Sequence, residues 1–101
     1  MAIVSQRYDF NSPTIVQVVP QTAGVYALYD GNGYLIYYGR SDNDIRSRLL
    51  SHLAGNEGRC TQAAASFNIE ITQRAISREK ELLEEFKRQA GRLPSCNDKV
   101  G

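Results

Sequence analysis

The chain has 101 residues, of which 42% are hydrophobic, and its net charge is +1, as expected for one folded domain with a modest core. No apolar run approaches the about 18 residues that a membrane-spanning helix needs, which disfavours a membrane protein. The opening stretch MAIVSQRYDF lacks the apolar core of a secretory signal, so a cytoplasmic protein is expected.

The basic residues are clustered although the net charge is nearly neutral. Three arginines lie between positions 40 and 48, and three further basic residues lie between 87 and 92. They predict either a compact basic face suited to a nucleic acid or a solvated surface that neighbouring aspartates neutralise. The two cysteines, Cys60 and Cys96, lack metal-ligand spacing. The sequence leaves two alternatives, a disulfide between them or two free thiols, and the free thiols are favoured in a reducing compartment.

The first third of the chain predicts an N-terminal extension followed by a hairpin. Residues 1–23 are mixed, and TIVQVV at 14–19 alternates like a short strand before Pro20. Residues 24–29 and 34–38 are rich in tyrosine and aliphatic residues, which predicts two strands. The intervening DGNG is typical of a hairpin turn, because Asp, Asn and Gly tolerate positive φ.

A first helix is predicted at roughly 43–54. Ile45 and Leu49 recur at helical spacing, and Ser41 with Asp44 resembles a capping box. The stretch CTQAAA that follows predicts a short helical turn.

A third strand and a second helix complete the pattern. FNIEIT alternates, with Phe67 and Ile69 on one face, and REKELLEEFKRQA predicts a helix that Ser77 caps and Gly91 ends. The order of elements predicts a small α/β (α+β) domain over residues 1–101. Its mainly antiparallel, three-stranded central sheet is flanked by helices.

Pairing across the predicted turn places Tyr26 opposite Tyr37 and Ala27 opposite Ile36. The two tyrosines then share one face of the sheet, and Leu35 lies on that face as well. A cross-strand tyrosine pair is common in sheet packing, so by itself it does not establish a chemical role. The other tyrosines of the hairpin are expected to pack: Tyr29, Tyr34 and Tyr38.

Polar residues further along the chain suit phosphodiester hydrolysis if the fold brings them to this tyrosine pair. Arg48 and His52 lie four residues apart on the predicted helix and so share a face. A carboxylate of the second helix, Glu79 or Glu81, can hold a divalent metal, and an arginine can bind phosphate oxygens. A phenol or an imidazole can take a proton from water. Taken singly, each residue is also typical of a solvated helix surface.

These residues together resemble the GIY-YIG nucleases, a superfamily that includes homing endonucleases, some restriction enzymes and the incision domain of bacterial excision repair. The motifs appear in order between positions 24 and 97, as GVY, YYG, DIRSRLLSH, REKELLEEF and LPSCN. Each motif is short, but their order and spacing together make the resemblance specific.

The resemblance implies roles for five catalytic residues. Tyr26 matches the tyrosine that acts as general base or orients water, and Tyr37 matches the tyrosine of the second motif. Arg48 matches the phosphate-binding arginine, and His52 falls close to the base. Glu79 matches the glutamate that holds one metal ion, Mg²⁺ or Mn²⁺.

Three further residues are implied in substrate binding or in support of the site. Arg40 falls where many members have lysine, Gly39 would leave room for a phosphate backbone, and Asn97 matches a residue that supports the site. Two features depart from the family pattern. Tyr38 replaces a small aliphatic residue, and the interval from Glu79 to Asn97 is long.

The predicted function is a metal-dependent endonuclease that hydrolyses phosphodiester bonds in nucleic acid, with DNA favoured over RNA. Low sequence specificity is expected, because the chain shows no zinc-finger spacing or helix-turn-helix that could read bases. The alternative is a non-catalytic nucleic-acid-binding module on the same fold. The sequence leaves open the strandedness of the substrate, the biological pathway and the oligomeric state.

Overall fold

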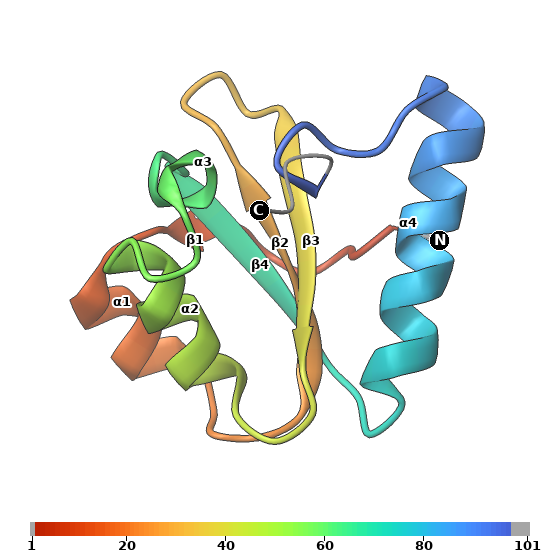
Figure 1. Cartoon of the computed structure of the whole chain (residues 1–101). Coiled ribbons are helices and arrows are strands. Elements are labelled where there is room, and N and C mark those ends of the chain that lie inside the picture. Colours follow the sequence, from red (N-terminus) through yellow and green to blue (C-terminus); the bar gives the residue numbers. More distant parts are fainter. Residues whose placement is uncertain (1, 98–101) are drawn as a thin grey trace.

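The computed structural model describes residues 2–97, which form a small α+β domain with helices on both faces of one antiparallel sheet (Figure 1). The strand order is β1-β4-β2-β3. No helix of the described residues is long and apolar enough to cross a membrane. In chain order the elements are β1 (Tyr8–Asp9), α1 (Ser12–Val18), β2 (Gly24–Tyr29), β3 (Leu35–Ser41), α2 (Ile45–Leu53), α3 (Arg59–Gln62), β4 (Ser66–Ile71) and α4 (Ala75–Ala90).

The expected fold class is confirmed, with one strand more than predicted. The central strands β4, β2 and β3 are the three that the sequence predicts, and β2 is buried along its whole length between its two neighbours. The additional strand, β1, has two residues from the N-terminal extension, and it pairs with the start of β4 through Tyr8 and Phe67.

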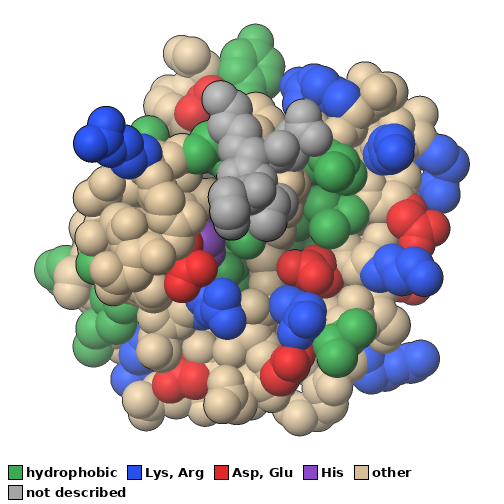
Figure 2. All heavy atoms as spheres, viewed as in Figure 1, with side chains coloured by type: hydrophobic (Ala, Val, Ile, Leu, Met, Phe, Trp, Pro, Cys, Tyr) green, Lys and Arg blue, Asp and Glu red, His purple; other side chains and the backbone are tan. Residues whose placement is uncertain are grey.

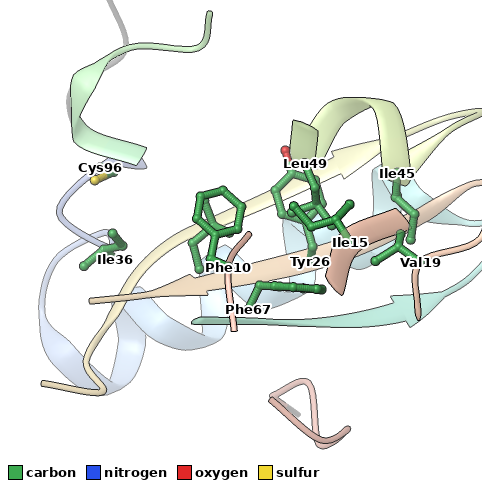
Figure 3. Packing of buried hydrophobic residues seen from close by; sticks show 10 residues of the cluster. Phe10, Ile15, Val19, Tyr26, Ile36, Ile45, Leu49, Phe67 and Cys96 are labelled. Carbon is green, nitrogen blue, oxygen red and sulfur yellow. The ribbon is translucent and has the colours of Figure 1, made fainter. Parts of the chain in front are cut away.

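Two apolar clusters hold the helices against the sheet. Helices α1 and α2 cover one face, where Ile15, Leu49 and Phe67 pack with Tyr26 (Figure 3). Helix α4 covers the opposite face, where Leu82 lies in the second cluster (Figure 1). Burial of these side chains stabilises each helix more than intrinsic helix propensity does in so short a chain.

The strand predicted at 14–19 is wrong, because this segment belongs to α1. The Asn11 side chain accepts a hydrogen bond from the Thr14 amide at 2.9 Å, and a proline occupies the first turn. Ile15 and Val19 are both fully buried, at the spacing of one helical turn. The helical cap and the burial of one helix face therefore override the alternating pattern.

The predicted pairing register of the hairpin is also wrong. A β-bulge inserts Ile36, so that Leu28 pairs with Tyr37 and Tyr26 pairs with Gly39. The pairing is one position off the predicted register on the turn side of the bulge and two positions off beyond it, which leaves Tyr26 and Tyr37 on the same face. Leu35, on the turn side of the bulge, lies on the opposite face from that predicted.

The tyrosines predicted to pack do so with one exception. Tyr29 and Tyr38 are buried against α4, but Tyr34 is 71% exposed at the hairpin turn. The packing role expected of Tyr34 is therefore wrong, because its side chain lies mostly in solvent.

The favoured prediction of two free thiols is wrong as well. The fold brings the Cα atoms of Cys60 and Cys96 to 5.6 Å, and the two residues form a disulfide. This bond joins α3 to the segment after α4, which lies along the outer edge of β3, where the Cys96 amide donates to the Ile36 carbonyl at 2.8 Å. The bond and this segment cover part of an edge strand that would otherwise be open.

The helix boundaries differ from the predicted ones by a few residues. Asp44, rather than Ser41, caps α2, because its side chain accepts from the Ser47 amide. Helix α4 begins before Ser77, whose hydroxyl donates to the Arg74 carbonyl within the first turn. Gly91 ends α4 in the left-handed conformation, as predicted.

Candidate active site

Three aromatic side chains from three elements meet on the α2 face of the sheet. Tyr26 of β2, Tyr37 of β3 and His52 of α2 have ring centroids between 5.1 and 6.2 Å apart. The Tyr26 hydroxyl lies 2.6 Å from Nε2 of His52. The tyrosine pair predicted from the hairpin is therefore present, as a diagonal rather than a directly opposite pair.

Gly39 makes this arrangement possible. A Cβ atom at Gly39 would lie 2.5 Å from the Tyr26 ring and hydroxyl and 2.6 Å from the Tyr37 ring. The sequence predicted that the space next to Gly39 would admit a phosphate backbone. In the structure, ring atoms of the two tyrosines occupy this space. Gly24 serves packing in a similar way, because a Cβ there would lie 2.6 Å from the Glu70 carbonyl of β4.

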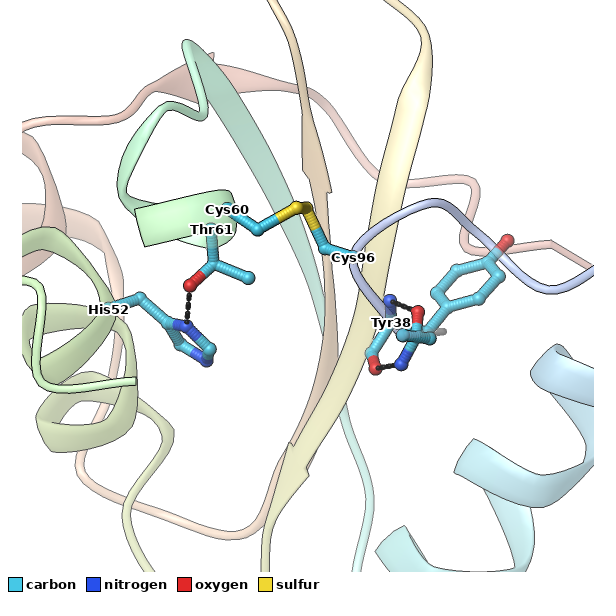
Figure 4. Close-up of a disulfide and its surroundings, with 6 residues drawn as sticks. Tyr38, His52, Cys60, Thr61 and Cys96 are labelled. Atoms are coloured by element: carbon cyan, nitrogen blue, oxygen red, sulfur yellow. Dashed lines mark hydrogen bonds between the residues drawn. A yellow bond between two sulfur atoms is a disulfide. The ribbon is translucent and has the colours of Figure 1, made fainter. Parts of the chain in front are cut away.

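His52 is a buried residue rather than a half-exposed one, with 1% of its surface accessible. Burial lowers the pKa of its imidazole from 6.5 to about 4, so the ring is neutral at neutral pH. Its second nitrogen, Nδ1, lies 2.7 Å from the Thr61 hydroxyl of α3 (Figure 4). Both ring nitrogens therefore have a side-chain partner.

The Tyr26 phenol is held in its protonated form. Burial raises its pKa well above 10, and the nearby Tyr37 raises it further, whereas the positive charge of Arg48 opposes the shift. Burial also raises the pKa of Tyr37, to which the charge of Glu79 contributes. A free phenolate is therefore scarce near neutral pH, and Tyr26 can take a proton only by passing its own to an acceptor. Nε2 of His52 is placed to be that acceptor.

Arg48 lies at the exposed rim of these rings. Its guanidinium is 3.5 Å from the Glu57 carboxylate, and its side chain is 45% exposed. Glu57 also accepts a hydrogen bond from the Ser51 hydroxyl at 2.9 Å. A polar surface hollow next to Arg48 extends from α2 to Ser41 at the end of β3. An anion that enters this hollow can reach Arg48 in place of Glu57.

Glu79 of α4 approaches the site from the other side of β3. Its Oε1 accepts from Nε of Arg40 at 3.2 Å, while Nη1 of Arg40 donates to Asp42. Burial raises the pKa of Glu79, and the charge of Arg40 counteracts this shift. Glu81, the alternative metal ligand, is 67% exposed and pairs with Arg78 instead. Of these two glutamates, Glu79 is the one whose charge reaches the tyrosines.

The residues at this site fit a metal only as a single-carboxylate site. No group of three or more His, Cys, Asp or Glu side chains among residues 2–97 is placed to enclose an ion. Mg²⁺ commonly keeps several waters and binds proteins through one or two carboxylates plus substrate phosphates. The Glu79 carboxylate, which is partly exposed and close enough to Arg48 for that charge to lower its pKa, is compatible with that mode of binding.

Asn97 supports β3 from its outer edge. Its side chain accepts from the Tyr38 amide and donates to the Tyr38 carbonyl, both at 2.9 Å (Figure 4). This pair of bonds repeats what a neighbouring strand would supply to the edge. Asn97 therefore contacts the backbone next to Tyr37, and both the oxygen and the nitrogen of its side-chain amide are used there.

The arginines of the first basic cluster do not form one continuous basic surface. Arg40 and Arg48 pair with carboxylates, and Arg46 donates to the Val19 carbonyl at 2.7 Å, which ties α2 to the end of α1. On the face shown in Figure 2, Lys and Arg side chains alternate with Asp and Glu side chains. Attraction of a polyanion at long range is therefore weaker than the arginine content suggests.

Two residues of this site lie outside every motif of the sequence. Thr61 lies in a four-residue helix nine positions after His52, and Glu57 lies in the loop between them. Neither belongs to a motif of the hairpin or of the two long helices. Their roles depend on how α3 folds back onto α2.

Comparisons with known proteins agree with this fold. The model of the GIY-YIG catalytic domain matches residues 22–92. UvrABC system protein C of Erwinia tasmaniensis is 36% identical over 78 residues, which are 74% of this chain and 13% of that protein. The same protein of Shewanella denitrificans is 37% identical over 67 residues, which are 63% of this chain and 11% of its own length.

The chain belongs to the GIY-YIG family. The family match points to an endonuclease. The chain spans 11–13% of the length of the relatives it matches, so the similarity concerns their GIY-YIG portion.

Proposed function

We propose that this protein is a metal-dependent endonuclease that hydrolyses phosphodiester bonds in DNA with low sequence specificity. The observation that carries the proposal is the 2.6 Å contact between the Tyr26 hydroxyl and the buried His52 ring, beside Arg48. Packing alone would be served as well by apolar rings, since buried polar groups cost free energy unless they are paired. A phenol that contacts a neutral imidazole is instead suited to moving a proton.

In the proposed reaction, Tyr26 takes a proton from the attacking water while it passes its own proton to Nε2 of His52. The transfer is concerted, because the raised pKa of Tyr26 disfavours a separate phenolate. The Arg48 guanidinium leaves its ion pair with Glu57 and binds the phosphate instead, because the phosphate oxygens match its paired N–H donors. Tyr37 packs against His52 and keeps bulk water away from the proton pathway.

Glu79 would hold one Mg²⁺ or Mn²⁺ ion, with water and phosphate oxygens as the remaining ligands. When bound, such an ion neutralises the phosphate and stabilises the leaving oxygen. Arg40 contacts the same carboxylate and keeps it oriented toward β3. Asn97 supports the strand that carries Tyr37 and Arg40, and Gly39 provides the space in which the tyrosines meet.

DNA is the favoured substrate because the family resemblance includes the incision domain of bacterial excision repair. Low sequence specificity is expected because residues 2–97 contain no element of a kind that reads base edges. We place the protein in the cytoplasm, where that substrate lies. There the Cys60–Cys96 disulfide would be exposed to a reducing thiol pool.

The proposal is tested by incubating the purified chain with labelled single-stranded, double-stranded and branched DNA and with RNA of the same sequence. Each substrate is tested with Mg²⁺, with Mn²⁺ and with a chelator. We expect cleavage of DNA that requires the ion and falls at least about 100-fold in Glu79→Gln. Glu81→Gln is the matched control, because Glu81 lies on the same helix but is exposed, and this variant should cut normally.

The same experiment separates the rival function. Binding of DNA without cleavage under any metal condition would contradict the proposal and support a non-catalytic nucleic-acid-binding module. Cleavage that persists in the chelator, or that Glu79→Gln leaves intact, would refute the assigned metal site.

A further inference from the structure

We propose that Thr61 is a positioning residue, which selects the tautomer of His52 that can accept the proton of Tyr26. This inference rests on the proposed function and adds to it a residue from α3. Thr61 is 3% exposed, and its hydroxyl lies 2.7 Å from Nδ1 of His52 (Figure 4). It is the side chain that contacts the ring nitrogen remote from Tyr26.

A neutral imidazole carries one proton, on either Nδ1 or Nε2, and each nitrogen here faces a hydroxyl that can donate or accept. The more acidic phenol of Tyr26 is the stronger donor and the aliphatic hydroxyl of Thr61 is the stronger acceptor, which favours the proton on Nδ1. If Nδ1 carries the proton and donates it to Thr61, the lone pair of Nε2 faces the Tyr26 hydroxyl. If Nε2 carries the proton, the lone pair faces Thr61 and His52 can accept nothing from Tyr26. The proposed reaction therefore requires the first form, in which Thr61 is the acceptor.

The position of Thr61 is fixed by covalent and tertiary contacts. Helix α3 has four residues and no side-chain cap, so it has little stability as an isolated helix. Cys60, adjacent to Thr61, is bonded to Cys96, and Cys96 precedes the Asn97 that supports β3. One crosslink thus holds Thr61 at His52 (Figure 4) and also holds Asn97 at Tyr38.

The chain offers a direct measurement, because His52 is its only histidine. In protein labelled with ¹⁵N-histidine, long-range ¹H–¹⁵N correlation spectra at neutral pH report which ring nitrogen is protonated. We expect a protonated Nδ1 and an unprotonated Nε2. A wild-type ring protonated mainly on Nε2 would overturn the proposal. This readout does not depend on cleavage, so it stands even if the proposed function fails.

Two variants extend the test to the reaction. Thr61→Val keeps the size of the side chain but removes the acceptor, so the Nε2-protonated form should gain population. The kcat for DNA cleavage should fall about 10- to 100-fold with little change in KM, as partial loss of general-base catalysis predicts. Thr61→Ser restores the hydroxyl and should restore both the tautomer and most of kcat.

Unchanged kcat and tautomer in folded Thr61→Val would contradict the proposal, as would equal losses in the valine and serine variants. Circular dichroism and the dispersion of amide resonances establish whether Thr61→Val is folded. If it is not, the wild-type spectrum and the serine variant still decide the matter, because neither removes the hydroxyl. Wild-type protein that shows the expected tautomer but no cleavage would refute the proposed function and leave the placement of the proton intact.

Discussion

On the α2 face of the sheet the candidate active site has a buried, uncharged centre closed by hydrogen bonds, with Arg48 at its exposed rim, whereas on the α4 face the site is charged and partly open. Tyr26 and His52 on the first face are almost fully buried, and each has a side-chain partner. Glu79 and Arg40 on the second face are 25% and 35% exposed. The edge strand β3 separates the two groups, and the charge of Glu79 acts across it on Tyr37.

This difference matches two separate chemical tasks. Proton transfer between a phenol and an imidazole needs fixed distances and little competing water, which burial provides. Binding of a metal ion and a phosphate needs ligands that can exchange their partners, which partial exposure provides. Changes on the buried face should therefore cost stability and activity together, and changes on the charged face should cost mainly activity.

The largest effect on stability is expected from loss of the disulfide. Its two cysteines are 36 positions apart, and removing a crosslink of this span costs about 4 kcal/mol in a chain-entropy estimate. We predict this loss in the double variant Cys60→Ala and Cys96→Ala, measured by guanidinium unfolding. Wild-type protein treated with a dithiol reductant should lose a similar amount. A change below about 1 kcal/mol in both cases would show that the bond does not constrain the fold.

The next effect is a loss of stability in acid. The pKa of His52 is about 4 in the folded protein and 6.5 when unfolded, so between these values the unfolded chain binds a proton that the folded protein does not. The free energy of unfolding should therefore fall as the pH decreases from 6.5 to 4, by about 3 kcal/mol from this residue. His52→Gln is the control, and subtracting its pH profile isolates the contribution. Parallel profiles for the two proteins would contradict the lowered pKa of His52. That pKa also reflects two nearby charges of opposite effect, since Glu57 raises it and Arg48 lowers it.

A smaller effect is expected from a methyl group inserted between the two tyrosines. The Cβ of Gly39→Ala would overlap both rings, and overpacking of this kind costs about 1–3 kcal/mol. The contact between Tyr26 and His52 should also be disturbed, so kcat should fall. Gly31→Ala is the control, because nothing lies within 4 Å of a Cβ built there. Equal stability and activity in the two variants would show that Gly39 is not needed for the packing.

The smallest change in stability is expected on the charged face. Arg40→Gln removes ion pairs with Asp42 and Glu79 that are partly exposed, and such pairs contribute about 0–1 kcal/mol. Cleavage should nevertheless decrease, because Glu79 loses the group that orients it. A loss of stability as large as that of the disulfide variant would erase the distinction between the two faces.

Local patterns predict most of this fold, and contacts between distant segments account for what they miss. The hairpin and both long helices follow from turn residues and apolar spacing that lie within each element. Helix α1 was also readable in part, since Asn11 followed by Pro13 is a helix-start signal that the alternation of TIVQVV obscured. The bulge at Ile36 has no comparable signal, because it depends on how β3 packs between two layers.

The candidate site divides in the same way. Tyr26, Tyr37, Arg48 and His52 were predictable because each belongs to a motif, and a displacement of the register by two positions preserves the face on which the tyrosines lie. The contact of Thr61 and the disulfide were not predictable from the sequence. The contact depends on the placement of a four-residue helix, and the disulfide joins two segments 36 positions apart. The long interval between Glu79 and Asn97 departs from the family pattern. It contains the turn after α4 that brings the chain back to β3, where Asn97 binds.

The most direct test of the account compares single-turnover cleavage by Tyr26→Phe and Tyr34→Phe, with Mg²⁺ and DNA in saturating amounts. Both variants lose one hydroxyl from the same hairpin, but only that of Tyr26 contacts His52, and Tyr34 is exposed. We predict that Tyr26→Phe lowers the rate of the chemical step about 10²- to 10⁴-fold and that Tyr34→Phe leaves it unchanged. A folded Tyr26→Phe protein that cuts DNA at the wild-type rate would contradict the proton pathway through Tyr26 and His52.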